Sequence, residues 1–216
     1  MNMKVKSGLM AVAACLALSG CQSAYYGAWE KLGVEKRDIL VDRVENAKES
    51  QEDAQEQFAD ALEEFSALIN FDGGELEDVY DELNGEYEDS KAAAENVTAR
   101  IDKVQSVADA LFSEWEDELE KYDSAKLRRS SEEKLRATSR QYDTMIKAMR
   151  KAESRMEPVL TALQDNVLYL KHNLNASAVG ALQGELETIQ QDVSRLISEM
   201  KASVAESDAF IRTMKN

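Results

Sequence analysis

The chain has 216 residues, a net charge of −16 and a hydrophobic content of 44%, and it contains one Pro and nine Gly. The hydrophobic content argues against a disordered chain, and the scarcity of helix breakers, with 31% charged residues, favours long helices over sheets. The acidic charge repels phosphate backbones, so we expect no binding of nucleic acid.

The first residues carry the features of a secretory signal. Two lysines precede an apolar run at positions 9–18, which is too short to span a bilayer but typical of the core of a signal peptide. The run ends in Leu18-Ser19-Gly20-Cys21, which resembles the bacterial lipobox. The resemblance implies cleavage after Gly20 and attachment of a thioether-linked diacylglycerol to Cys21.

The residues that follow the cysteine bear on the membrane address. Each buried lipid CH₂ contributes about 0.8 kcal/mol, so two or more acyl chains on Cys21 hold a protein stably at a membrane. In Gram-negative lipoproteins an Asp at the next position usually retains the protein in the inner membrane, so Gln22 indicates the outer membrane and its periplasmic face. Tyr25, Tyr26 and Trp29 come next, and they either rest on the lipid headgroups or plug the end of the helical core.

Apolar residues recur at heptad spacing in residues 36–70, which predicts a helix that meets others along a left-handed seam. The seam positions are Leu40, Val44, Ala47, Gln51, Ala54, Phe58, Ala61, Phe65 and Leu68. Gln51 interrupts the apolar run, either as a polar residue that sets the register or as part of a layer open to water. The two glycines within residues 70–74 then end the helix.

A second helix is predicted for residues 75–122. Its seam positions are Leu76, Tyr80, Leu83, Tyr87, Ser90, Ala94, Val97, Ile101, Val104, Ala108, Leu111 and Trp115, followed by Leu119 or Tyr122. The Asn84-Gly85 pair is a candidate break in this helix, because Gly in a helix interior costs about 1 kcal/mol.

A third helix is predicted for residues 130–175, because Ser130 and Glu133 have the spacing of a capping box. Its seam positions are Leu135, Thr138, Tyr142, Met145, Met149, Ala152, Met156, Val159, Leu163 and Leu170. Pro158 lies inside this helix and removes a backbone hydrogen bond, so we expect a kink at residues 154–157.

Asn175 or Ser177 is the expected cap of a fourth helix. Its seam positions are Leu182, Leu186, Ile189, Val193, Leu196, Met200, Val204, Ser207, Ile211 and Met214. About four long helices with short connections predict an all-α, elongated antiparallel bundle. We therefore expect a signal peptide at residues 1–20, a lipid-anchored segment at 21–35 and a single bundle domain at 36–216.

The charges of the second and third helices differ in sign. Residues 75–123 hold 17 acids and 4 bases, whereas residues 124–175 hold 11 bases and 6 acids. This contrast predicts that the two helices pair with each other, with Arg128 and Arg129 near Glu120 and Asp123. Lys134 and Arg136 are likewise expected near Glu114 and Asp117. The bases beyond this region are Arg140, Lys147, Arg150 and Arg155, and they leave open a second hypothesis, a site for an anionic or hydrophobic ligand.

The inventory of catalytic groups is short. His172 is the only histidine, the lipid occupies Cys21, and the chain has no Glu-x-x-His pair and no Gly-rich phosphate loop. His172 follows an apolar helix, where a cap on the helix C-terminus is its expected role. We therefore expect no enzymatic activity, no cofactor and no metal site.

Several stretches resemble one family of Gram-negative lipoproteins. They are residues 21–26 (CQSAYY), 36–44 (KRDILVDRV), 71–74 (FDGG), 156–160 (MEPVL) and 170–175 (LKHNLN). The family is catalogued as a domain of unknown function, so the resemblance implies the address and the helical fold but no mechanism. Our hypothesis is a scaffold or adaptor of the envelope with a protein partner, and the sequence leaves the identity of that partner and the oligomeric state open.

Overall fold

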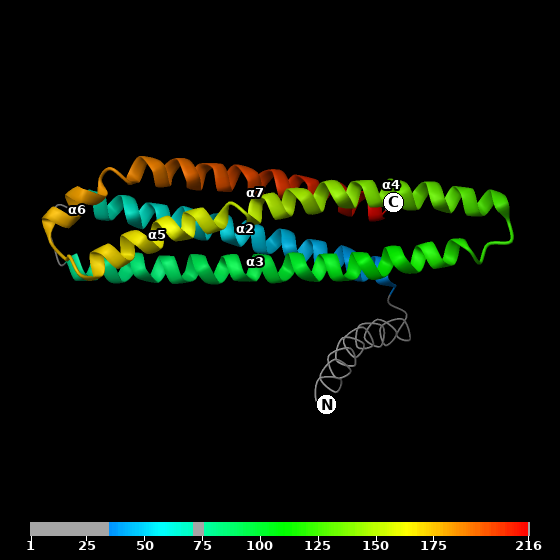
Figure 1. Cartoon of the computed structure of the whole chain (residues 1–216), viewed down its shortest axis with the longest axis horizontal. Coiled ribbons are helices and arrows are strands. Elements are labelled where there is room, and N and C mark those ends of the chain that lie inside the picture. The colour runs from blue at the N-terminus through cyan, green and yellow to red at the C-terminus, as the bar shows by residue number, and fades with distance from the viewer. Residues whose placement is uncertain (1–34, 71–75, 216) are drawn as a thin grey trace, which may run out of the picture.

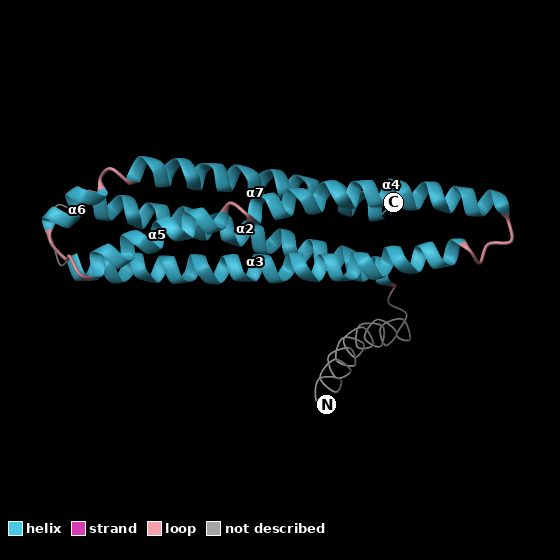
Figure 2. Ribbon diagram, in the orientation of Figure 1, coloured by secondary structure: helices cyan, strands magenta, loops and turns pink. Residues whose placement is uncertain are grey.

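The computed structural model describes residues 35–70 and 76–215, and helices form nearly all of this part of the chain (Figure 2). The helices are α2 (Lys36–Ile69), α3 (Leu76–Leu119), α4 (Ala125–Glu153), α5 (Met156–Lys171), α6 (Ala176–Leu182) and α7 (Leu186–Lys215). The described residues include no strand, so the predicted all-α class is confirmed.

The helices form an elongated antiparallel bundle with four rods (Figure 1). α2 is the first rod and α3 the second, while α4 with α5 and α6 with α7 form the third and the fourth. α3 packs against α2, α4 and α5, and α7 packs against α2, α4 and α5. At one end α3 and α4 continue past the start of α2 and the end of α7, so the bundle narrows to two helices there (Figure 1).

The core follows the predicted seams closely. Every predicted seam residue of α2 is buried, and so is every predicted seam residue of the α4–α5 rod. In α3 the buried part of the seam runs from Leu83 to Ala108, and the residues toward both ends of the helix are half-buried. In α7 two predicted seam residues, Leu186 and Val204, are only half-buried, and Ser203 is buried at the core position expected of Val204. The step from Met200 to Ser203 keeps the spacing of three and four that a seam requires.

Gln51 lies inside the core, with an exposed fraction of 0%. The hydroxyl of Ser203 donates a hydrogen bond of 2.8 Å to Oε1 of Gln51, which joins α2 to α7. The Nε2 of Gln51 is buried and has no partner among the described residues. The hypothesis of a layer open to water is therefore wrong for Gln51, and the hydrogen bond to Ser203 fits the alternative of a residue that sets the register.

The ends of the helices correct one predicted cap and settle another. α4 begins at Ala125 with Ser124 as its cap, so the predicted start at Ser130 was five residues late. The side chain of Asn175 accepts hydrogen bonds from the backbone N–H groups of Ser177 and Ala178 at the start of α6. α3 continues without a break through Gly85, which is exposed.

Candidate functional site

The third rod breaks between α4 and α5, at Ser154 and Arg155. The backbone N–H of Ser154 donates to the carbonyl of Arg150, and that of Arg155 donates to the carbonyl of Ala152. Pro158 lies in the first turn of α5, where a backbone N–H has no acceptor within the helix. The predicted kink is thus present as a full break, because the proline can begin a helix there but cannot continue α4.

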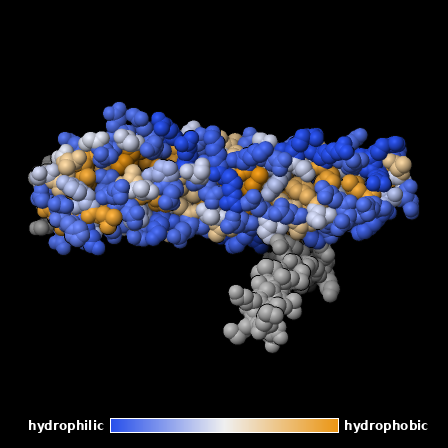
Figure 3. Space-filling model, viewed as in Figure 1, coloured by the Kyte–Doolittle hydropathy of each residue, from blue (hydrophilic) through white to orange (hydrophobic). Residues whose placement is uncertain are grey.

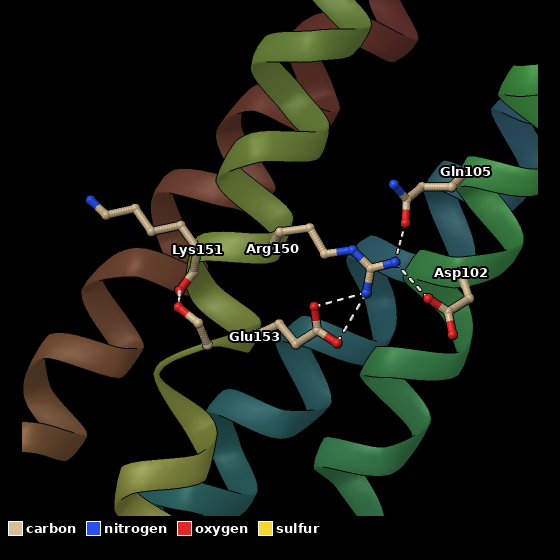
Figure 4. A network of polar contacts seen from close by, with 6 residues as sticks. Asp102, Gln105, Arg150, Lys151 and Glu153 are labelled. Carbon is tan, nitrogen blue, oxygen red and sulfur yellow. Dashed lines mark hydrogen bonds and ion pairs between the residues drawn. The ribbon is translucent and has the colours of Figure 1, made fainter.

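Arg150 connects the end of α4 to α3 beside this break (Figure 4). Its Nη2 donates to Oδ1 of Asp102 at 2.5 Å and also to Gln105, and its Nη1 donates to Oε2 of Glu153 at 2.8 Å. Burial acts to lower the pKa of Arg150, but the hydrogen bonds and charges of Asp102 and Glu153 outweigh burial and raise that pKa. Arg150 therefore stays charged and holds α3 and α4 together at the break.

An open groove of about 690 Å³ begins beside this network and runs between α3 and α5. Its apolar lining comes from Tyr87, Ala94, Ala99, Met156 and Leu160. On the face of the bundle that Figure 3 shows, apolar patches likewise appear between hydrophilic side chains. The floor of the groove suits the apolar face of an extended or helical segment, since such segments bind in grooves through a row of apolar side chains.

The groove is bordered by acids. Four carboxylates and one base line it, and Asp102 and Glu153 among them are paired with Arg150. Glu95 on α3 and Glu157 on α5 are exposed on the two sides of the groove. This charge favours a basic partner over an anionic one, because like charges across an interface are costly.

The bases that raised the hypothesis of an anionic ligand do not form a site together. Arg150 contacts acids of its own chain, as described above. Arg140, Lys147 and Arg155 are exposed, and none of them forms an ion pair within residues 35–70 and 76–215. None of the three lines the α3–α5 groove.

None of the ion pairs predicted between the second and third helices forms a salt bridge among the described residues. Glu114 pairs with Lys36 of α2 at 3.0 Å, and Arg136 pairs with Glu132 of its own helix. Between α3 and α4, Arg150–Asp102 is the one salt bridge in the described part of the chain. Three further bridges join α4 or α2 to α7, namely Lys151–Glu199, Lys48–Asp208 and Lys215–Glu45. Long side chains on a bundle surface reach whichever neighbour lies beside them, so net charge alone does not identify the partner.

Leu18, Ser19, Gly20, Cys21 and Gln22 all lie outside the described residues, as do the aromatic residues that follow them. In the part of the chain that is described, no helix is long and apolar enough to cross a bilayer. The same part contains no cluster of three or more His, Cys, Asp or Glu side chains placed to hold a metal ion. His172 is exposed and occupies the C-cap position of α5, where its backbone N–H donates to Leu170.

Sequence reasoning did not identify the α3–α5 groove. In the sequence analysis, Glu95 and Glu157 entered only the net charge of their helices. Tyr87 and Met156 were predicted only as seam positions of the core. The signal that was available is Pro158, because a break in one rod removes side-chain cover from the rod beside it.

The comparisons with known proteins give one family and no function. Neither the curated proteins nor the solved structures include a match to the chain. The sequence profile of one family, described as "Protein of unknown function (DUF2959)", matches residues 25–214, which include all the described helices except the last residue of α7. The chain therefore belongs to the family described as Protein of unknown function (DUF2959).

Proposed function

We propose that this protein is a lipid-anchored adaptor of the outer membrane, facing the periplasm, and that its α3–α5 groove holds a basic amphipathic segment of an envelope protein. The observation that carries the proposal is the groove itself, which has an apolar floor and acidic borders. An amphipathic helix with basic flanks matches both features. The proposed role requires binding alone, without catalysis.

The lipid anchor rests on the sequence around Cys21. Its test is metabolic labelling with a fatty acid, comparing the natural chain with Cys21→Ser. We expect the substitution to abolish labelling and to release the protein from membranes, because the thiol is the attachment point. Continued labelling of Cys21→Ser would refute the anchor, and equal labelling of a Ser23→Ala control would show that processing near the cysteine is otherwise intact.

The groove is tested by site-specific photocrosslinking in intact envelopes. A photoreactive residue in place of Thr161, which lines the groove, is expected to capture a basic segment of one envelope protein, identified by mass spectrometry of the crosslinked peptide. The charge reversals Glu95→Lys and Glu157→Lys, made together, are expected to reduce the capture at least tenfold.

The matched control reverses two exposed acids on another face, Glu49→Lys and Asp53→Lys on α2. It changes the net charge by the same amount and is expected to leave the capture unchanged. Equal loss in both double variants would mean that net charge, and not the groove, draws the partner. Crosslinked peptides that are acidic or lipid-derived would also contradict the proposal.

The second hypothesis, a module that binds an anionic or hydrophobic ligand, receives less support. Arg150 forms ion pairs with Asp102 and Glu153. The other three bases that motivated this hypothesis, Arg140, Lys147 and Arg155, do not line the α3–α5 groove. Native mass spectrometry of the protein isolated from membranes distinguishes the two hypotheses, because a bound small molecule would add a defined mass that a peptide-binding adaptor lacks.

A further inference from the structure

A second groove, of about 770 Å³, lies where α2 begins and α7 ends. α3 and α4 continue beyond this point as a pair, without the two other rods (Figure 1). The groove is lined by Leu111, Trp115 and Glu118 of α3, and by Ala137 of α4. Met214 at the end of α7 and Glu35 just before α2 also line it. We call it the Trp115 groove.

The seam of α3 loses its cover at this groove. Val104 and Ala108 are fully buried, with exposed fractions of 0%, whereas Leu111 and Trp115 further along the same seam are only half-buried. The indole of Trp115 is fixed by a hydrogen bond of 2.8 Å from its Nε1 to the hydroxyl of Ser131 on α4. The apolar seam of α3 is thus less covered from Leu111 onward, at the level where α2 begins and α7 ends.

The chain itself supplies a segment at the edge of this groove. Glu35 lines the groove and is the first described residue, so the segment that precedes it is covalently joined to the edge of the groove. The family profile begins at residue 25, ten residues before Glu35, which makes residues 25–34 part of the family domain and not only a tether. Within them, Tyr25, Trp29 and Leu32 have the spacing i, i+4 and i+7, which places three large apolar side chains on one face of a helix.

The length of residues 25–34 also suits the length of the groove. Ten residues form a helix of about 15 Å, and the stretch of α3 from Leu111 to Glu118 that lines the groove is about 10 Å long, at about 1.5 Å per residue. Glu114 and Glu118 of α3 and Lys134 of α4 border the groove, and the segment carries Glu30 and Lys31 between its apolar positions. The groove therefore offers an apolar floor for one face of the segment and charges of both signs for the other.

We propose that residues 25–34 dock in the Trp115 groove, with Tyr25, Trp29 and Leu32 covering Leu111 and Trp115. The segment then replaces the missing third helix at this end of the bundle. A consequence follows if Cys21 carries a lipid: the anchor then lies four residues before the docked segment, so the half of the bundle that holds the Trp115 groove is kept close to the membrane. The docking itself does not depend on the lipid, and its test stands apart from that of the proposed function.

The experiment uses the fluorescence of Trp115 in the mature protein. The chain has two tryptophans, so Trp29→Phe leaves Trp115 as the only one while keeping an aromatic side chain in the segment. We expect Trp115 to be shielded from acrylamide in this variant. Adding Tyr25→Ser and Leu32→Ser, with Ser in place of Phe at position 29, is expected to raise the quenching constant at least twofold.

The control adds Glu30→Ser and Lys31→Ser to the Trp29→Phe variant and is expected to leave the quenching constant unchanged, because these positions lie off the apolar face. Leu32→Ser alone in the Trp29→Phe variant is expected to give a smaller rise, which keeps the test usable if the larger change lowers helicity. Circular dichroism verifies that each variant retains its helical content.

Three results would overturn the docking. Equal quenching in the parent and the serine variants would mean that the segment does not cover Trp115. Shielding that grows with protein concentration would identify a second copy of the chain as the occupant. Shielding that appears only after phosphatidylethanolamine–phosphatidylglycerol vesicles are added would assign the cover to the membrane.

Discussion

The guanidinium of Arg150 on α4 lies 2.5 Å from the carboxylate of Asp102 on α3, at the level where the third rod breaks. The same guanidinium also binds Glu153, so one side chain joins two helices and the last turn of α4. The helix is interrupted at this level, and the contact holds the last turn of α4 against α3 there.

Arg150→Met is expected to lower the free energy of unfolding by about 1 to 2 kcal/mol, because it leaves Glu153 partly buried without its partner. Methionine keeps most of the aliphatic stem, so the loss reports the charged contacts. The measurement is urea denaturation at pH 7. Arg136→Met, at an exposed pair within one helix, is the control and should change stability by no more than about 0.5 kcal/mol. Equal effects of the two substitutions would mean that the Arg150 contacts add nothing at the break.

Glu64 on α2 has a raised pKa, first because of burial and then because of the charges of Glu82, Glu86, Glu63 and Asp60. The fold therefore favours the neutral carboxyl. The stability from this group is present below its ordinary pKa and is lost as the pH rises through the raised pKa of the folded state. At pH 7 the charged form opposes folding.

Glu64→Gln is accordingly expected to stabilise the protein at pH 7 by about 0.5 kcal/mol, the usual scale for like-charge neighbours on helix surfaces. The gain should shrink to zero as the pH falls below the ordinary pKa of a glutamate. Thermal unfolding at a series of pH values measures both effects. Glu56→Gln, on an exposed position of α2, is the control that carries the same chemical change. A gain that is independent of pH would contradict the electrostatic cause.

Gln51 and Ser203 form a buried polar contact whose remaining amide N–H groups have no partner among the described residues. Replacing both residues, Gln51→Met with Ser203→Ala, is expected to stabilise the fold by about 1 to 2 kcal/mol, because it removes the cost of the unpaired amide. Ser203→Ala alone should destabilise, since it leaves Oε1 of Gln51 unpaired as well. A double-mutant cycle in urea measures the coupling, and a double variant less stable than the natural chain would show that the contact is net stabilising.

Asn175 is the N-cap of α6, the first helix of the fourth rod. Its side chain accepts from two backbone N–H groups, at 3.0 and 3.1 Å, so Asn175→Ala is expected to cost about 1 kcal/mol. Ser177→Ala serves as the control, because Ser177 is the other residue that the sequence offered as a cap and its exposed side chain makes no hydrogen bond within the described residues. A larger loss in Ser177→Ala than in Asn175→Ala would reverse this assignment. Thermal unfolding of both variants decides it.

The sequence by itself determined the class of fold and most of the core. Seam residues such as Leu40, Phe58 and Val97 could be recognised because a repeat of three and four residues buries one face of a helix wherever its neighbours lie. The break before Pro158 could be anticipated for an equally local reason, since proline lacks the backbone N–H that α4 would need to continue.

The tertiary structure alone decided which side chains meet between helices. Glu114 reaches Lys36 of α2 and not the bases of α4, and Ser203 takes the core position expected of Val204, where its hydroxyl meets Gln51. Both grooves arise from where rods break or end relative to one another. Heptad spacing fixes the face that a helix buries but not its axial position against its neighbours, so these sites become visible only once the rods are placed together.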